Sequence, residues 1–133
     1  MTSASNPEPE SPPDAALRRV LMRFPQLTLA LVFGSVARGT ARPDSDLDMA
    51  VASRSGALTA EERWDIVDAL AQETGRPVDL IDLQLASPPL LGEIVRHGRR
   101  VWGDDAAYGR LISRNLFEQA DFAPYRHRLL SER

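Results

Sequence analysis

A short stretch of the chain combines residues that could bind a phosphate group and a metal ion. Gly34 and Ser35 directly follow the apolar run 27–33, and Asp46 and Asp48 come after an interval of ten residues. Glycine permits a sharp backbone turn, and a serine that opens a helical turn offers free N–H groups and a dipole that favour an anion. The pattern therefore predicts a phosphate-binding turn next to a pair of carboxylates.

The two carboxylates are expected on one side of a strand, because residues two apart in a strand point the same way. Asp46 and Asp48 would converge there. The opposite, buried side would take the apolar residues of this strand, Leu47, Met49 and Val51. Paired carboxylates suit Mg²⁺, which binds few of them and fills its remaining positions with water and phosphate oxygens. We therefore expect a site for Mg²⁺ and a nucleoside triphosphate.

One basic residue fits the same site. Arg38 lies about one helical turn after Ser35, and its forked guanidinium can pair with two phosphate oxygens. The chain contains no lysine at all, which excludes a Walker-type phosphate loop because that loop needs a lysine. Arg38 is therefore the cation that we expect beside the nucleotide.

The order Gly-Ser-x-Ala-Arg-Gly at 34–39 and Ser-Asp-x-Asp at 45–48 resembles the signature of the DNA polymerase β-like nucleotidyltransferase superfamily. Within it, the chain is similar to the minimal nucleotidyltransferases (MNT), which include the antitoxins paired with HEPN toxins. The resemblance covers roughly residues 14–103. It implies an α/β (α+β) fold, a small mixed β-sheet with helices packed on one face, and a third carboxylate on a later strand.

Two residues compete to be that third carboxylate. The segment 77–83 reads Pro-Val-Asp-Leu-Ile-Asp-Leu, and its acids, Asp79 and Asp82, are three apart, so they point to opposite faces of a strand. Periodicity alone leaves both open. The family's hydrophobic–Asp–hydrophobic pattern favours Asp79, which by resemblance would bind metal or act as base toward the attacking hydroxyl. Asp82 is the alternative, and could instead cap the turn that follows.

Composition narrows the class of protein. A chain of 133 residues is expected to form one core. The absence of cysteine excludes disulfides, thiol catalysis and Cys-based zinc sites. No run reaches transmembrane length and no signal peptide pattern is present, so we expect a cytoplasmic protein without a membrane partner. The net charge of −3 argues against nucleic acid as a partner.

Alternating helix and strand patterns predict an α/β domain. The proline-rich residues 1–13 are expected to be a disordered tail, and Asp14 to cap a helix that runs to about Phe24. The expected strands are 27–33, 47–52, 78–83 and a short edge strand at 101–102. The first of these lacks polar alternation, as a strand does when both its faces are covered.

Helix caps are expected at three further places. Thr59 would open a helix through a capping box, with its inner face formed by Trp64, Val67 and Leu70. Ser87 would cap a helix that ends at His97, and Asp104 would begin the last helix. We expect the nucleotidyltransferase domain to comprise residues 14–103, and residues 104–133 to form a C-terminal helix and tail that dock a partner.

The resemblance implies an antitoxin that moves AMP from ATP to a hydroxyl, expected to be a tyrosine, of a cognate HEPN toxin. Two Mg²⁺ ions would be bound by Asp46, Asp48 and Asp79, while Gly34, Ser35 and Arg38 would hold the nucleotide. The chain is almost fully used by this site and its supports, so the acceptor is expected on another chain. Two alternatives remain: a non-catalytic antitoxin that acts by binding and occlusion, and a small-molecule nucleotidyltransferase of the aminoglycoside-modifying kind.

Overall fold

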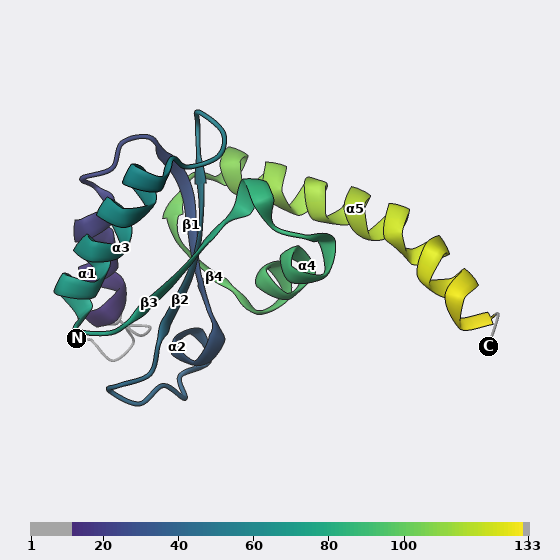
Figure 1. Cartoon of the computed structure of the whole chain (residues 1–133). Coiled ribbons are helices and arrows are strands. Elements are labelled where there is room, and N and C mark those ends of the chain that lie inside the picture. The colour runs from purple at the N-terminus through teal and green to yellow at the C-terminus, as the bar shows by residue number, and fades with distance from the viewer. Residues whose placement is uncertain (1–11, 132–133) are drawn as a thin grey trace, which may run out of the picture.

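A computed structural model describes residues 12–131 of the chain, with side chains for 14–120. Four strands form one mixed sheet in the order β3–β2–β1–β4 (Figure 1). The central strand β1 (Leu27–Phe33) pairs antiparallel with β2 (Leu47–Ser53) and with β4 (Arg99–Gly103). The edge strand β3 (Val78–Asp82) runs parallel to β2. The predicted mixed sheet is therefore confirmed, and its edge strand β4 is longer than predicted.

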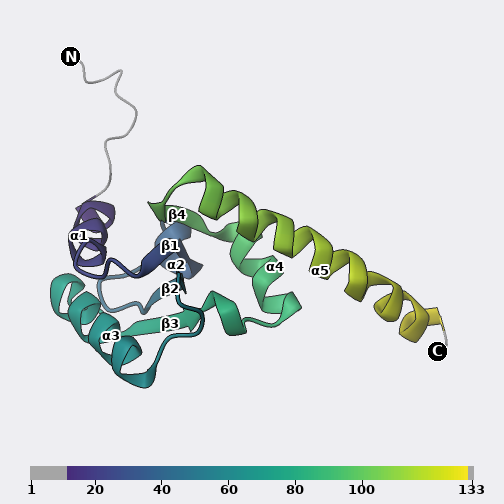
Figure 2. The same ribbon diagram turned by 90° about the horizontal axis from the view of Figure 1, so that it is seen from above.

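Helices cover both faces of this sheet. α1 (Pro12–Leu21) and α3 (Ala60–Thr74) lie on one face, and α4 (Pro88–His97) and the first part of α5 (Asp105–Ser131) lie on the other (Figure 2). The expectation of helices on a single face is thus corrected. Two segregated apolar clusters hold the layers together, one with α1 and α3 and one with α4 and α5.

The physical reason for two covered faces is visible in the strands. Leu31 and Ala30 are neighbours in β1, and both are fully buried, although they face opposite clusters. A strand of this kind needs an apolar layer on each side. The lack of polar alternation in 27–33 therefore indicated the second covered face, which the family-based expectation of helices on one face did not include.

Two predicted details of the helices are wrong. Asp14 does not cap α1 but lies in its first turn, where its carboxylate pairs with Arg99. Of the predicted tail 1–13, residues 12 and 13 already belong to α1, and 1–11 lie outside the described residues.

The inner face of α3 also differs from the prediction. Its buried stripe contains Ile66 and Leu70, while Trp64 is 67% exposed. Trp64 and Ile66 are two residues apart, and such residues do not share a face of a helix.

Other predicted caps are confirmed. Thr59 forms the full capping box with Glu62, in which each side chain bonds to the main-chain N–H group of the other residue. The Ser87 side chain accepts the Leu90 N–H group, and the Asp104 carboxylate accepts that of Ala107 at 2.8 Å. None of the helices in the described part of the chain combines the length and apolar content needed to cross a membrane.

Candidate active site

Asp48 and Asp79 are direct neighbours across the parallel pair of strands β2 and β3. On the other side of β2, Asp48 is paired with Phe33, the last residue of β1. The buried neighbours Leu47 and Met49 point into the cluster with α1 and α3, so Asp48 faces the opposite side of the sheet. The register of three strands therefore places Asp48 beside Asp79 and at the start of the Gly34 turn.

Gly34 is in contact with the carboxyl group of Asp48. Its φ of +76° is strained for any residue with a side chain. A Cβ atom at this position would also overlap the Oδ2 atom of Asp48 and lie 3.0 Å from its Cγ. Backbone conformation and space thus both require glycine here, and the turn that was predicted to bind phosphate forms one structural unit with the carboxylate.

The motif helix α2 (Gly34–Arg38) is a short turn that begins directly after β1. Among the described residues, no side chain caps the start of this helix with a hydrogen bond, and its first turn contains no acidic residue. It ends at Gly39, which is left-handed with φ of 76° and donates its N–H group to carbonyls of the helix, including that of Val36 at 3.2 Å. Ser35 therefore lies at the open N-terminal end of α2, as predicted for an anion-binding turn.

Several charges meet at Asp48. Burial raises the pKa of this carboxyl group above its usual range, and the negative charges of Asp79 and Asp46 raise it further. The positive charge of Arg38 acts in the opposite direction on the same pKa. These four side chains therefore share one electrostatic environment, in which negative charge is in excess.

The carboxylates of this site suit a divalent cation whose remaining ligands are water and phosphate oxygens. Among the described residues, no three His, Cys, Asp or Glu side chains are arranged as a complete ion site on their own. Mg²⁺ does not require one, since it typically takes one or two carboxylates together with water and substrate phosphate oxygens. Asp46 is exposed, and Asp48 is half-buried, which suits such a shared site.

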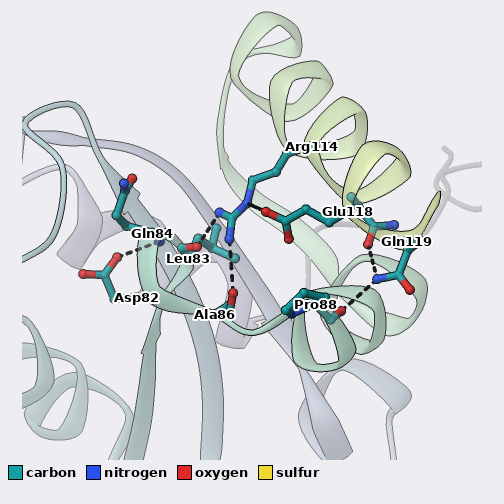
Figure 3. Close-up of polar contacts among 9 residues, drawn as sticks. Asp82, Leu83, Gln84, Ala86, Pro88, Arg114, Glu118 and Gln119 are labelled. Carbon is teal, nitrogen blue, oxygen red and sulfur yellow. Dashed lines mark hydrogen bonds and ion pairs between the residues drawn. The ribbon is translucent and has the colours of Figure 1, made fainter. Parts of the chain in front are cut away.

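Asp82 lies elsewhere and has a different environment. It is only 3% exposed. Its Oδ2 accepts the Leu58 N–H group at 2.8 Å, and its Oδ1 accepts that of Gln84 at 2.9 Å. The second of these bonds caps the short 3₁₀ helix η1 (Leu83–Leu85), as Figure 3 shows. The structure therefore brings Asp79, and not Asp82, to Asp48.

The turn that Asp82 caps also anchors the last helix. Arg114 of α5 donates to the carbonyl oxygens of Leu83 at 2.5 Å and of Ala86 at 3.1 Å (Figure 3). Gln119 donates to the Pro88 carbonyl at 2.8 Å. The middle of α5 is thus bonded to the segment 83–88 that follows β3, while the helix extends beyond the sheet (Figures 1 and 2).

Arg99 is a supporting residue that sequence analysis missed. Its guanidinium forms a two-point ion pair with Asp14, at 2.8 and 3.2 Å, and donates to the Ala37 carbonyl of α2 at 3.3 Å. Arg99 thus connects α1, β4 and the end of the motif helix. Asp14 and Arg99 are 85 residues apart, and no local pattern indicates their pairing.

Comparison with known proteins finds a matching domain family. Residues 16–107 match the family model for the polymerase beta nucleotidyltransferase domain. The matched segment includes all six predicted site residues and both competing acids of β3.

Individual relatives are similar over different lengths. The chain is 38% identical over 80 residues to the protein adenylyltransferase MntA of Shewanella oneidensis, covering 60% of this chain and 57% of that protein. A crystal structure of a toxin–antitoxin with AMP-PNP contains a chain of 27% identity and TM-score 0.78, with 90% and 96% of the two chains covered. The tri-AMPylated Shewanella oneidensis HEPN toxin in complex with MNT antitoxin contains another, at 26% identity, TM-score 0.65 and coverages of 89% and 96%.

Proposed function

The chain belongs to the polymerase beta nucleotidyltransferase family, and we propose that it is an antitoxin that transfers AMP from ATP to a hydroxyl group of a cognate HEPN toxin. The observation that carries the proposal is the placement of Asp48 directly beside Asp79 and against Gly34. Such a site joins two functions, because the turn can hold a triphosphate and the carboxylates can hold its cation.

The relatives support the choice of substrate and partner. The relative with 38% identity is a protein adenylyltransferase, and a structurally similar chain occurs in a complex whose HEPN toxin is AMPylated. The aligned part spans 57% of the first relative, so its activity is carried over here as a proposal. An acceptor tyrosine on the toxin and two Mg²⁺ ions complete the proposed reaction.

The chemistry assigns a role to each side chain. Asp46 and Asp48 would bind the cations, and Asp79 would hold the acceptor hydroxyl and take its proton, directly or through a bound cation. When bound, Mg²⁺ would neutralise charge on the triphosphate and on the attacking oxygen. The acceptor oxygen forms a bond to the α-phosphorus of ATP, and the bond from that phosphorus to the β-phosphate oxygen breaks, releasing pyrophosphate. Arg38, Ser35 and the open turn at Gly34 would orient the phosphates.

The acceptor is proposed to come from the toxin, which residues 104–133 would dock. α5 extends past the sheet (Figure 1), and Leu116 and Phe117 on it are 65% and 73% exposed. Large exposed apolar side chains that lie together are typical of protein interfaces. Because the reaction needs ATP, we expect it to take place in the cytoplasm.

The proposal is tested by incubating the toxin with this protein, ATP and Mg²⁺ and measuring the intact mass of both chains. We expect whole AMP units on the toxin, together with loss of its toxic activity. Asp46→Asn should abolish the gain in mass. Asp44→Asn is the matched control, because Asp44 is an exposed acid of the same loop and should leave it unchanged. Neutralisation by a stable complex without any gain in mass would overturn the proposal in favour of occlusion.

A further inference from the structure

The first carboxylate of the site, Asp46, lies outside the sheet. It follows the loop 39–45 and immediately precedes β2, and its side chain is exposed. The loop closes on itself where the Ser45 N–H group donates to the Arg42 carbonyl at 3.0 Å, and the Arg42 N–H group donates to Ser45 Oγ at 2.8 Å. These bonds shape the turn, but they do not tie it to the strand that carries Asp79.

Arg76 makes that connection. Its Nη1 atom donates to the carbonyl oxygens of Arg42, at 2.6 Å, and of Ser45, at 3.1 Å. Arg76 follows the left-handed Gly75 at the end of α3 and precedes β3 by two residues. Its own N–H group is held by the Thr74 hydroxyl at 3.3 Å. The guanidinium thus bridges from the start of β3 to the loop that delivers Asp46.

The peptide groups on both sides of Asp46 are therefore held by the same segment. Before it, the Ser45 carbonyl accepts from Arg76. After it, the Leu47 N–H group donates to the Pro77 carbonyl at 2.8 Å. Since residues 76 and 77 lead directly into the strand of Asp79, the two contacts set the placement of Asp46 relative to that acid. Only the Arg76 contact depends on a side chain.

We propose that Arg76 is a positioning residue that holds Asp46 at the metal site by fixing the main chain before it. The inference rests on the proposed function, because it assumes that Asp46 binds a cation together with the nucleotide. Without the arginine, the Leu47–Pro77 bond still starts β2, but the Ser45 peptide can rotate. The fold would persist, and the carboxylate would no longer be oriented. Groups that orient metal ligands typically change metal affinity by about 10- to 100-fold when they are removed.

A matched pair of variants separates positioning from a general loss of side-chain packing. Arg76→Met removes the contact to the loop. Arg54→Met is the control, because Arg54 also donates to a main-chain carbonyl, that of Pro25 at 3.1 Å, but follows β2 at the opposite end of that strand. Binding of Mn²⁺ in the presence of a non-hydrolysable ATP analogue would be measured by electron paramagnetic resonance, with thermal unfolding of every variant recorded alongside.

We expect Arg76→Met to raise the Kd for Mn²⁺ by about tenfold or more, and Arg54→Met to change it by less than about twofold. Transfer by Arg76→Met should recover at high Mg²⁺ concentration, whereas a folding defect would not respond in this way. Arg76→Lys should restore part of the affinity. If Arg76→Met does not fold, Ser45→Ala loosens the same turn from the other side and should weaken Mn²⁺ binding in the same direction.

Two results would overturn the inference in distinguishable ways. Equal Mn²⁺ affinity in Arg76→Met and Arg54→Met, with normal binding by the wild type, would refute the role of Arg76 alone. Wild-type protein whose Mn²⁺ binding is absent, or is unchanged by Asp46→Asn, would refute the proposed function and the inference with it.

Discussion

The carboxyl group of Asp48 occupies the space into which a side chain at Gly34 would point. Gly34 directly follows Phe33, the last residue of β1, and Asp48 is paired with Phe33 on the neighbouring strand β2. The contact means that the turn and the carboxylate can be tested together, because a single methyl group at position 34 displaces both.

Gly34→Ala should therefore disable the site. Gly34 and Gly39 both have a φ of 76°, but only at Gly34 does a Cβ atom meet another group, since none lies within 4 Å at Gly39. Both substitutions add backbone strain of about 1–2 kcal/mol. We expect Gly34→Ala to reduce AMP transfer by about 100-fold or more, because misplaced groups alone can cost that much. Gly39→Ala should lose stability without a comparable loss of transfer per folded molecule. Equal transfer by the two variants would show that the Asp48 contact is unimportant.

The charge of Asp48 is expected to lower the stability of the metal-free protein. Burial and the neighbouring acids Asp79 and Asp46 raise the pKa of Asp48 in the folded state. The folded state therefore binds the proton more tightly than the unfolded state, and stability falls as pH rises from the ordinary value of 3.8 through the raised pKa. At neutral pH, where Asp48 is ionised in both states, the loss of folding stability is complete.

Asp48→Asn should thus raise the melting temperature in EDTA at pH 7. Solvent screening limits the gain in the free energy of unfolding to about 1 kcal/mol or less. The gain should disappear below the usual pKa of an aspartate. Asp44→Asn provides the comparison, and a lower melting temperature for Asp48→Asn at pH 7 would refute this account of its environment. The stabilised variant should nevertheless be inactive.

The two acids of β3 should respond to substitution in opposite ways. Asp79 is exposed beside Asp48, whereas Asp82 is buried and accepts two main-chain N–H groups. Asp79→Asn should leave thermal stability nearly unchanged and reduce transfer by about 100-fold or more, as loss of a catalytic proton acceptor does. Asp82→Asn should lower the free energy of unfolding by about 1–3 kcal/mol, because the amide places an NH₂ donor where one of the two accepting oxygens was. The reverse pattern would assign the third carboxylate to Asp82.

The support of α2 by Arg99 can be tested through stability. Its ion pair joins the Asp14 side chain, which is 11% exposed, to the Arg99 side chain, which is 41% exposed. Arg99→Met should lower the free energy of unfolding by about 1–2 kcal/mol, which is less than the loss expected from breaking a fully buried ion pair. Arg96→Met is the control, because Arg96 and its partner Glu93 are both well exposed. A double-mutant cycle with Asp14→Asn should show coupling, and additive effects would argue against the connection.

The two-residue repeat of a strand correctly predicted which side of the sheet Asp48 faces. Alternation separated Asp48 from Leu47 and Met49, and the structure places these residues on opposite faces of the sheet. Periodicity could not choose between Asp79 and Asp82, because the choice depends on the register between β2 and β3, which is a property of the folded sheet.

The long-range contacts of two arginine side chains could not be predicted from the sequence either. Arg76 and Arg99 reach main-chain carbonyls 31 to 62 residues away, and their local surroundings resemble ordinary helix ends.

The wrong prediction for Trp64 has a simpler origin, since its spacing from Leu70 fits a helical stripe only loosely, and Ile66 fits it better. The layers on both sides of β1 were indicated by its composition.

The proposed reaction transfers the AMP portion of ATP by means of the three acids Asp46, Asp48 and Asp79. The most direct test supplies the toxin, Mg²⁺ and ATP labelled at either the α- or the γ-phosphate, and follows the label on the toxin. We expect the toxin to gain label only from α-labelled ATP, and this label should be lost in Asp46→Asn and kept in Asp44→Asn. Label from the γ-phosphate, or α-label that persists in Asp46→Asn, would contradict it.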